Sequence, residues 1–96
     1  MAKDLKCEAL DLLFDAVLKL ENREECYSFF EDLCTIKELQ DMGQRLEVAS
    51  MLMDKQKYQE IANKTGASTA TISRVNRVIN YGNDAYSLVI NRIKTS

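Results

Sequence analysis

Small, hydroxyl-bearing and basic residues alternate at short spacing in the C-terminal half of this 96-residue chain. On a helix, the side chains that would share one solvent-facing surface are Thr69, Ala70, Ser73, Arg74 and Arg77. Hydroxyl and guanidinium groups can hydrogen-bond to base edges and phosphates, and a face of this size and chemistry fits the major groove of DNA. The pattern therefore predicts sequence-specific recognition of double-stranded DNA.

Presenting such a face requires two short helices joined by a tight turn. Gly66 supplies a residue that tolerates positive φ in the turn, and Ala62 supplies a small residue where the helices touch. Ser68 can accept hydrogen bonds from backbone N–H groups at the start of the second helix. The apolar positions expected to face the body of the protein are Ile61, Ile72 and Val75. We therefore predict a helix-turn-helix over about 58–81; an ordinary helix pair with a glycine turn is the alternative.

The distribution of charge supports a nucleic-acid partner, although the formal net charge is −2. Residues 1–54 contain six basic and thirteen acidic residues, a net charge of −7, whereas residues 55–96 contain seven basic and two acidic residues, a net charge of +5. The basic half is expected to meet phosphates. The candidates for phosphate attraction are Lys57, Lys64, Arg74 and Arg77. Lys57 and Lys64 are equally compatible with ordinary solvated charges.

Composition argues against other classes of function. The chain has no histidine, the commonest general base, and no glycine signature for phosphates or dinucleotides. Its three cysteines, Cys7, Cys26 and Cys34, lack C-x-x-C spacing, so we expect buried thiols and neither a disulfide framework nor a metal site. No apolar run could span a bilayer and no signal peptide is evident, which predicts a cytoplasmic, non-enzymatic protein with no membrane partner.

The first predicted helix, about Leu5 to Leu20, carries two apolar stripes. One consists of Leu5, Ala9, Leu12, Leu13, Ala16, Val17 and Leu20, and the other of Cys7, Leu10, Phe14 and Leu18. A helix on a small monomer seldom needs so wide an apolar arc, and a domain of this length buries only a modest core. We therefore expect the second stripe to contact another chain in a homodimer; a deep groove in the same domain is the alternative.

The remaining apolar spacing is helical, and no segment alternates as a strand would. Asn22 is predicted to cap a second helix that ends near Cys34. Thr35 and Glu38 form a capping-box pattern for a long third helix that ends near Asp54. The side chains that the second helix is expected to bury are Cys26 or Tyr27, Phe29, Phe30 and Leu33.

The helix that carries the polar and basic face, the recognition helix, is predicted to reach Tyr81 and to stop at Gly82 as a C′ residue. Asn83 is predicted to cap a final helix, which gives an all-α fold of six helices. The predicted buried stripe of that last helix is Ala85, Tyr86, Val89, Ile90 and Ile93.

Six helices with a long third helix and a helix-turn-helix as the fourth and fifth resemble the Trp repressor superfamily, in particular the bacterial YerC/YecD-type Trp-repressor-like proteins. The stretches that carry the resemblance are Thr35, Gly43-Gln44-Arg45, 66–74, Phe14-Asp15, Glu24-Glu25-Cys26-Tyr27 and Gly82-Asn83-Asp84-Ala85-Tyr86. The resemblance implies an intertwined homodimer that regulates transcription at a roughly palindromic operator, with one recognition helix in each half-site. It also implies that Gln59 contacts DNA. The recognition-helix positions that it places at bases or phosphates are Thr69, Ala70, Thr71 and Ser73.

The resemblance further implies a possible effector pocket. Arg45 and Arg74 match the two arginines that hold tryptophan in the family, and Thr35 matches a third pocket position. The glycine that follows the second arginine in the family is Val75 here, and a pocket serine three residues later is Val78. We expect these valines to fill the space of the indole, so that no cofactor is required; a smaller effector between the arginines is the alternative.

These observations predict one DNA-binding domain over residues 1–96. Its partners are expected to be double-stranded DNA and a second copy of the chain. A helical protein–protein interaction module that does not bind DNA is the alternative function.

Overall fold

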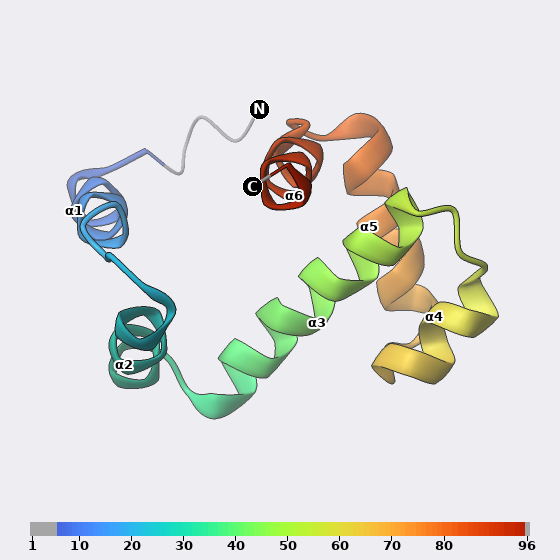
Figure 1. The fold of residues 1–96 in the computed structure, drawn as a ribbon, viewed down its shortest axis with the longest axis horizontal. Coiled ribbons are helices and arrows are strands. Elements are labelled where there is room, and N and C mark those ends of the chain that lie inside the picture. The colour runs from blue at the N-terminus through green and yellow to red at the C-terminus, as the bar shows by residue number, and fades with distance from the viewer. Residues whose placement is uncertain (1–5, 96) are drawn as a thin grey trace. The chain divides into compact units, whose positions relative to one another are not determined.

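The structure is a computed structural model that describes residues 6–95, and this range contains six α-helices and no strand (Figure 1). The helices are α1 (Glu8–Val17), α2 (Arg23–Leu33), α3 (Ile36–Met53), α4 (Tyr58–Thr65), α5 (Thr69–Tyr81) and α6 (Ala85–Lys94). The all-α prediction is confirmed. The chain divides into two compact units, an N-terminal unit of residues 1–39 and a C-terminal unit of residues 40–96.

Helix α1 is shorter than the sequence pattern predicts. It begins at Glu8, after an extended Cys7 whose side chain makes no capping hydrogen bond. Beyond its end, the N–H groups of Lys19 and Leu20 donate to carbonyls three residues back, at 3.0 and 3.1 Å. Bonds of this kind tighten the chain and end the α-helical ladder. The predicted end at Leu20 is therefore wrong, and the predicted start at Leu5 lies outside the described residues.

Helix α2 is capped as predicted. Asn22 Oδ1 accepts a hydrogen bond from the Glu25 N–H at 2.8 Å, and Glu25 Oε1 accepts one from the Glu21 N–H at 2.9 Å. These bonds satisfy donors that a helix N-terminus leaves without intrahelical partners. Phe29 and Phe30 pack edge to face on this helix, with ring centroids 5.4 Å apart.

The apolar side chains of α1 and α2 are not buried, which corrects the predicted stripe of α2. Neither helix contains a buried residue. Tyr27 and Leu33 are 64% and 51% exposed, and Leu12 and Leu18 are 71% and 81% exposed. An apolar stripe shows that a face needs cover, but it does not show which chain provides the cover. Within residues 6–95, no residue before Val48 is buried.

The cysteines are also more accessible than predicted. All three are free thiols; Cys7 is exposed, and Cys26 and Cys34 are half-buried. The prediction of buried thiols is therefore wrong. No cluster suited to a metal ion occurs among residues 6–95. Over the same residues, no helix combines the length and hydropathy needed to cross a membrane.

Helix α3 begins with the predicted capping box. Glu38 Oε1 accepts from the Thr35 N–H at 2.8 Å, and Thr35 Oγ1 accepts from the Glu38 N–H at 3.1 Å. The helix ends through Lys55, whose φ is +67°. The Lys55 and Gln56 N–H groups donate back to the carbonyls of Leu52 and Met51, at 3.0 and 3.1 Å. This is the Schellman pattern, with lysine at the left-handed position that glycine usually occupies.

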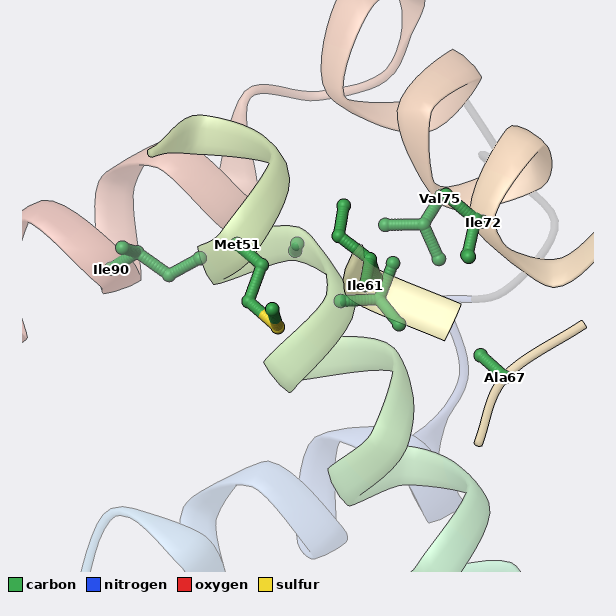
Figure 2. Close-up of a cluster of buried hydrophobic side chains, with 8 residues drawn as sticks. Met51, Ile61, Ala67, Ile72, Val75 and Ile90 are labelled. Carbon is green, nitrogen blue, oxygen red and sulfur yellow. The ribbon is translucent and has the colours of Figure 1, made fainter. Parts of the chain in front are cut away.

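The hydrophobic core lies in the C-terminal unit. Its buried members are Val48, Ala49, Met51, Ile61, Ala67, Ile72, Val75 and Ile90. Figure 2 shows Ile61 of α4 pointing toward Ile72 and Val75 of α5, while Met51 and Ile90 extend the cluster to α3 and α6. Four helices therefore share one core, and this core fixes the helix-turn-helix to the end of α3.

The predicted end of α5 at Tyr81 is confirmed, but the junction between α5 and α6 differs from its prediction in other respects. Helix α5 ends at Tyr81, but Gly82 is not left-handed, with φ −93° and ψ −146°. Glycine is needed there because a Cβ would lie 2.5 Å from the Val78 carbonyl oxygen. The N-cap of α6 is Asp84, in the left-handed region at φ +64°, so the predicted cap at Asn83 is wrong.

The predicted buried stripe of α6 is also only partly correct. Ile90 is buried and Tyr86 is half-buried against the core, but Val89 and Ile93 are exposed, as is Ala85. At the C-terminal end of α6, Lys94 Nζ lies 2.6 Å from Asp54 Oδ1. This half-exposed ion pair joins the end of α6 to the residue that follows α3.

Candidate nucleic-acid interface

Helix α4 begins with half of a capping box. Glu60 Oε1 accepts from the Lys57 N–H at 3.2 Å. The Lys57 ammonium group cannot return the bond, because it has no acceptor lone pair. Lys57 is exposed at the start of the helix, and Gln59, two residues later, is exposed as well. Ile61 faces the opposite way and is completely buried.

The turn between α4 and α5 has the predicted left-handed residue. Gly66 has φ +75°, and its N–H donates to the Ala62 carbonyl at 2.9 Å. Thr65 and Ala67 also stabilise this turn, which was not predicted from the sequence. Thr65 Oγ1 donates to the Ile61 carbonyl at 2.7 Å and accepts from the Ala67 N–H at 3.1 Å. Ala67 is buried, and its small size directly after Gly66 is the only sequence signal of its position.

The N-terminus of α5 is capped by the predicted residue. Ser68 Oγ accepts from the Thr71 N–H at 3.1 Å and donates to Thr71 Oγ1 at 3.1 Å. Ser68 and half-buried Thr71 therefore satisfy each other locally. The hydroxyl groups of Thr69 and Ser73 are exposed and make no hydrogen bond within residues 6–95. These two hydroxyls are the ones available to an external ligand.

One face of α5 is polar and positively charged. All of the residues predicted for this face are exposed: Thr69, Ala70, Ser73, Arg74 and Arg77. The helix contains no acidic residue, and neither guanidinium group takes part in a hydrogen bond or ion pair with the described chain. The positive end of the helix dipole lies at the same end as Thr69. The opposite face, through Ile72 and Val75, is buried in the core. A helix of this kind can bind a polyanion and hydrogen-bond to its bases at the same time.

The three predicted effector residues belong to two different units of the chain. Arg45 of α3 and Arg74 of α5 are exposed, and neither side chain takes part in a hydrogen bond or ion pair with the described chain. Thr35 belongs to the N-terminal unit, whereas both arginines belong to the C-terminal unit.

The two valines at the predicted pocket lie in different surroundings. Val75 is 1% exposed and is part of the core, whereas Val78 is 42% exposed. Val78 lines a mainly apolar pocket of about 290 Å³, whose other lining residues are Leu46, Asn83, Ala85, Tyr86 and Val89.

A larger open hollow of about 500 Å³ lies on α2. The carboxylates of Glu24, Glu25 and Asp32 line it. Like charges repel, so this hollow is unsuited to phosphate despite its size. This hollow is therefore no candidate for binding a polyanion, in contrast to the exposed basic side chains of α4 and α5.

Comparison with known proteins decides the family. A family model described as "Trp repressor protein" matches residues 8–94. The chain belongs to the Trp repressor family. Among Trp repressor family relatives, the uncharacterized protein YerC of Bacillus subtilis is 57% identical over 90 residues, which cover 94% of this chain and 86% of YerC.

Solved structures of Trp repressor family proteins have the same fold. A TrpR-like protein from Eubacterium eligens is 55% identical, with a TM-score of 0.92 over 95% of this chain and 94% of that one. A candidate Trp repressor from Staphylococcus aureus is 52% identical, with a TM-score of 0.95 over 100% of this chain and 97% of that one. The predicted resemblance to YerC-type members of the Trp repressor family is confirmed.

Proposed function

We propose that the protein is a transcriptional repressor that inserts α5 into the major groove of a specific double-stranded DNA site. The observation that carries the proposal is the exposed face of α5, on which Thr69, Ser73 and the two arginines have no partner in the described chain. The helix has 13 residues and is therefore about 20 Å long, while the major groove is about 12 Å wide and admits one helix.

Within this proposal, the residues of α5 have different tasks. Thr69, Ala70 and Ser73 face base edges, because they are short, exposed and free to make contacts. Ser68 and Thr71 shape the first turn of the helix and lie beside the DNA. The groups assigned to phosphates are Gln59, Lys57, Lys64, Arg74 and Arg77, all of which are exposed. Phosphate contacts supply affinity and register, whereas base contacts supply sequence preference.

The second part of the proposal is that residues 1–96 act as one DNA-binding domain within an intertwined homodimer. Support comes from the N-terminal unit, where Leu12, Phe14 and Leu18 are exposed and no side chain of residues 6–39 is buried. A small domain with so much uncovered apolar surface gains stability by burying it against a second copy. A twofold dimer would place its recognition helices on two half-sites about 34–36 Å apart. Because bacterial DNA lies in the cytoplasm, we expect the protein to act there.

Selection of bound sequences from a random pool of double-stranded DNA tests whether the protein recognises a specific sequence. We expect an enriched, palindromic sequence. Thr69→Val should change the preferred bases more than the general affinity, because it removes one exposed hydroxyl group and retains the shape. Ser28→Ala is the control, since it removes an exposed hydroxyl group from α2. Failure to enrich any sequence would refute the proposed function.

Sedimentation at micromolar concentration tests the dimer independently. A species with twice the mass of the chain is expected, and a clean monomer would refute this part of the proposal. A stable dimer that enriches no DNA sequence would favour the alternative function, a helical module for binding another protein. The exposed apolar residues of α1 and α2 are the observation that supports this alternative.

A further inference from the structure

Three hydrogen bonds meet at Thr65, the last residue of α4. Its hydroxyl group bonds to the Ile61 carbonyl and to the Ala67 N–H, as described above. Its backbone carbonyl accepts a third bond, from Gln44 Nε2 of α3, at 3.1 Å. Gln44 and Thr65 are separated by 21 residues along the chain. This third bond therefore links the long helix directly to the turn that precedes the recognition helix.

The Thr65 carbonyl is a group that the helix itself leaves without a partner. The last four carbonyls of an α-helix have no intrahelical donor. The Thr65 carbonyl is also part-buried, so water satisfies it poorly, and losing its donor would carry a free-energy penalty. The Gln44 amide, itself half-buried on α3, supplies the missing donor.

The core holds the helix-turn-helix against α3, and the Gln44 bond adds a directional contact to that packing. Ile61, Ile72 and Val75 pack through apolar contacts, which are not directional. A hydrogen bond requires both a short distance and a narrow range of angles. The Gln44 bond therefore fixes where the end of α4 lies along α3. Through Gly66 and Ala67, it also fixes where α5 begins.

We propose that Gln44 is a positioning residue for DNA reading: its amide holds the Thr65 carbonyl and sets the placement of α5 relative to α3. The inference rests on the proposed function. Gln44 does not touch DNA in this proposal and acts only through Thr65. Its neighbour Arg45 is exposed on the same helix, so a molecule that binds Arg45 would lie one residue from the contact between Gln44 and the turn.

Two substitutions of Gln44 distinguish the effect of its hydrogen bond from the effect of its side-chain volume. Gln44→Met has a similar length and no donor, whereas Gln44→Lys keeps a donor and places a positive charge at the C-terminal end of α4, where it is favourable. Gln40→Met is the matched control, because Gln40 is an exposed glutamine one turn earlier on α3. The DNA probes are the sequence enriched by wild-type protein and a scrambled duplex of equal length.

We expect Gln44→Met to lower affinity for the enriched sequence about tenfold, equal to about 1.4 kcal/mol. Affinity for the scrambled duplex should stay within about twofold, because the phosphate-binding charges are unchanged. Gln44→Lys should restore the ratio of the two affinities, and Gln40→Met should leave it at the wild-type value. An unchanged ratio in Gln44→Met, or an equal fall in Gln40→Met, would overturn the proposal.

Amide hydrogen exchange of the DNA-free protein tests the same bond without DNA. The Gly66 and Ala67 N–H groups, which bond to Ala62 and Thr65, should exchange faster in Gln44→Met and at the wild-type rate in Gln40→Met. If wild-type protein enriches no DNA sequence, the proposed function fails, and exchange alone decides whether Gln44 positions the turn. Equal exchange in both variants would overturn the role of Gln44.

Discussion

Replacing Arg77 with alanine tests the proposed docking face quantitatively. Arg77 is exposed and has no partner in the described chain, so its removal should leave the fold unchanged. If each Arg77 neutralises one phosphate, the proposed dimer loses two contacts. The logarithm of affinity changes with the logarithm of salt concentration by about 0.9 for each phosphate neutralised, so the slope should become flatter by about 1.8.

This change in slope corresponds to a measurable change in affinity. Between about 50 and 200 mM salt, the advantage of wild-type protein over Arg77→Ala should shrink about 12-fold. Fluorescence anisotropy of a labelled duplex across this range measures the effect. The loss should be similar on specific and scrambled DNA, because a phosphate contact carries no direct sequence information.

Lys19→Ala is the matched control for charge. Lys19 is exposed in the turn after α1, so the substitution removes the same charge from the N-terminal unit. Its slope should match that of wild-type protein. The assignment of α5 as the docking face would be refuted by an Arg77→Ala slope equal to wild type. It would also be refuted if Lys19→Ala flattened the slope by the same amount.

Three further predictions concern the turn, the long helix and the effector pocket. Gly66→Ala should lower the free energy of unfolding by about 1–2 kcal/mol, because φ is +75°. No atom lies within 4 Å of the added Cβ, so the loss would come from backbone strain alone. A urea titration that shows no loss would contradict this prediction. Gly43→Ala should raise it by about 1 kcal/mol through helix propensity, because nothing lies within 4 Å of the added Cβ; a decrease would instead indicate a second chain packed against Gly43. Tryptophan should leave DNA affinity unchanged, because Val75 and Val78 replace the small residues of the family pocket; a tenfold gain, about 1.4 kcal/mol of coupling, would show that prediction to be wrong.

The helix-turn-helix could be predicted almost residue by residue because its determinants are local. Gly66 has the positive φ that its residue type favours, and Ser68 caps the helix that follows it. Ile61 and Ile72 are buried as their spacing predicts. These features depend on neighbours within a few positions, so the sequence pattern contains enough information to specify them.

The features that could not be predicted depend on contacts between residues far apart in the sequence, or on a partner surface that would cover exposed apolar side chains. The bond from Gln44 to Thr65 requires α3 and α4 to be placed in space, and no periodic signal marks either residue. Burial of Tyr27 and Leu33 was predicted from apolar character alone, although the described chain provides nothing to cover them. Asn83 and Asp84 are both acceptable caps by residue type, so the sequence could not show that α6 begins at Ala85, directly after Asp84.

The absence of any buried side chain before Val48 within the described chain has a consequence for subunit exchange. In the proposed dimer, the other copy covers the apolar side chains that the first half of each polypeptide leaves exposed, so a subunit cannot leave without exposing that surface to water again. Dissociation of the two copies then has a high activation barrier. Exchange of subunits between existing dimers is therefore slow. Two related repressors made in the same cell would form hybrid dimers mainly while they are being synthesised, when unpaired chains are present. Each dimer would then keep its original composition, and its operator preference, for much of its lifetime.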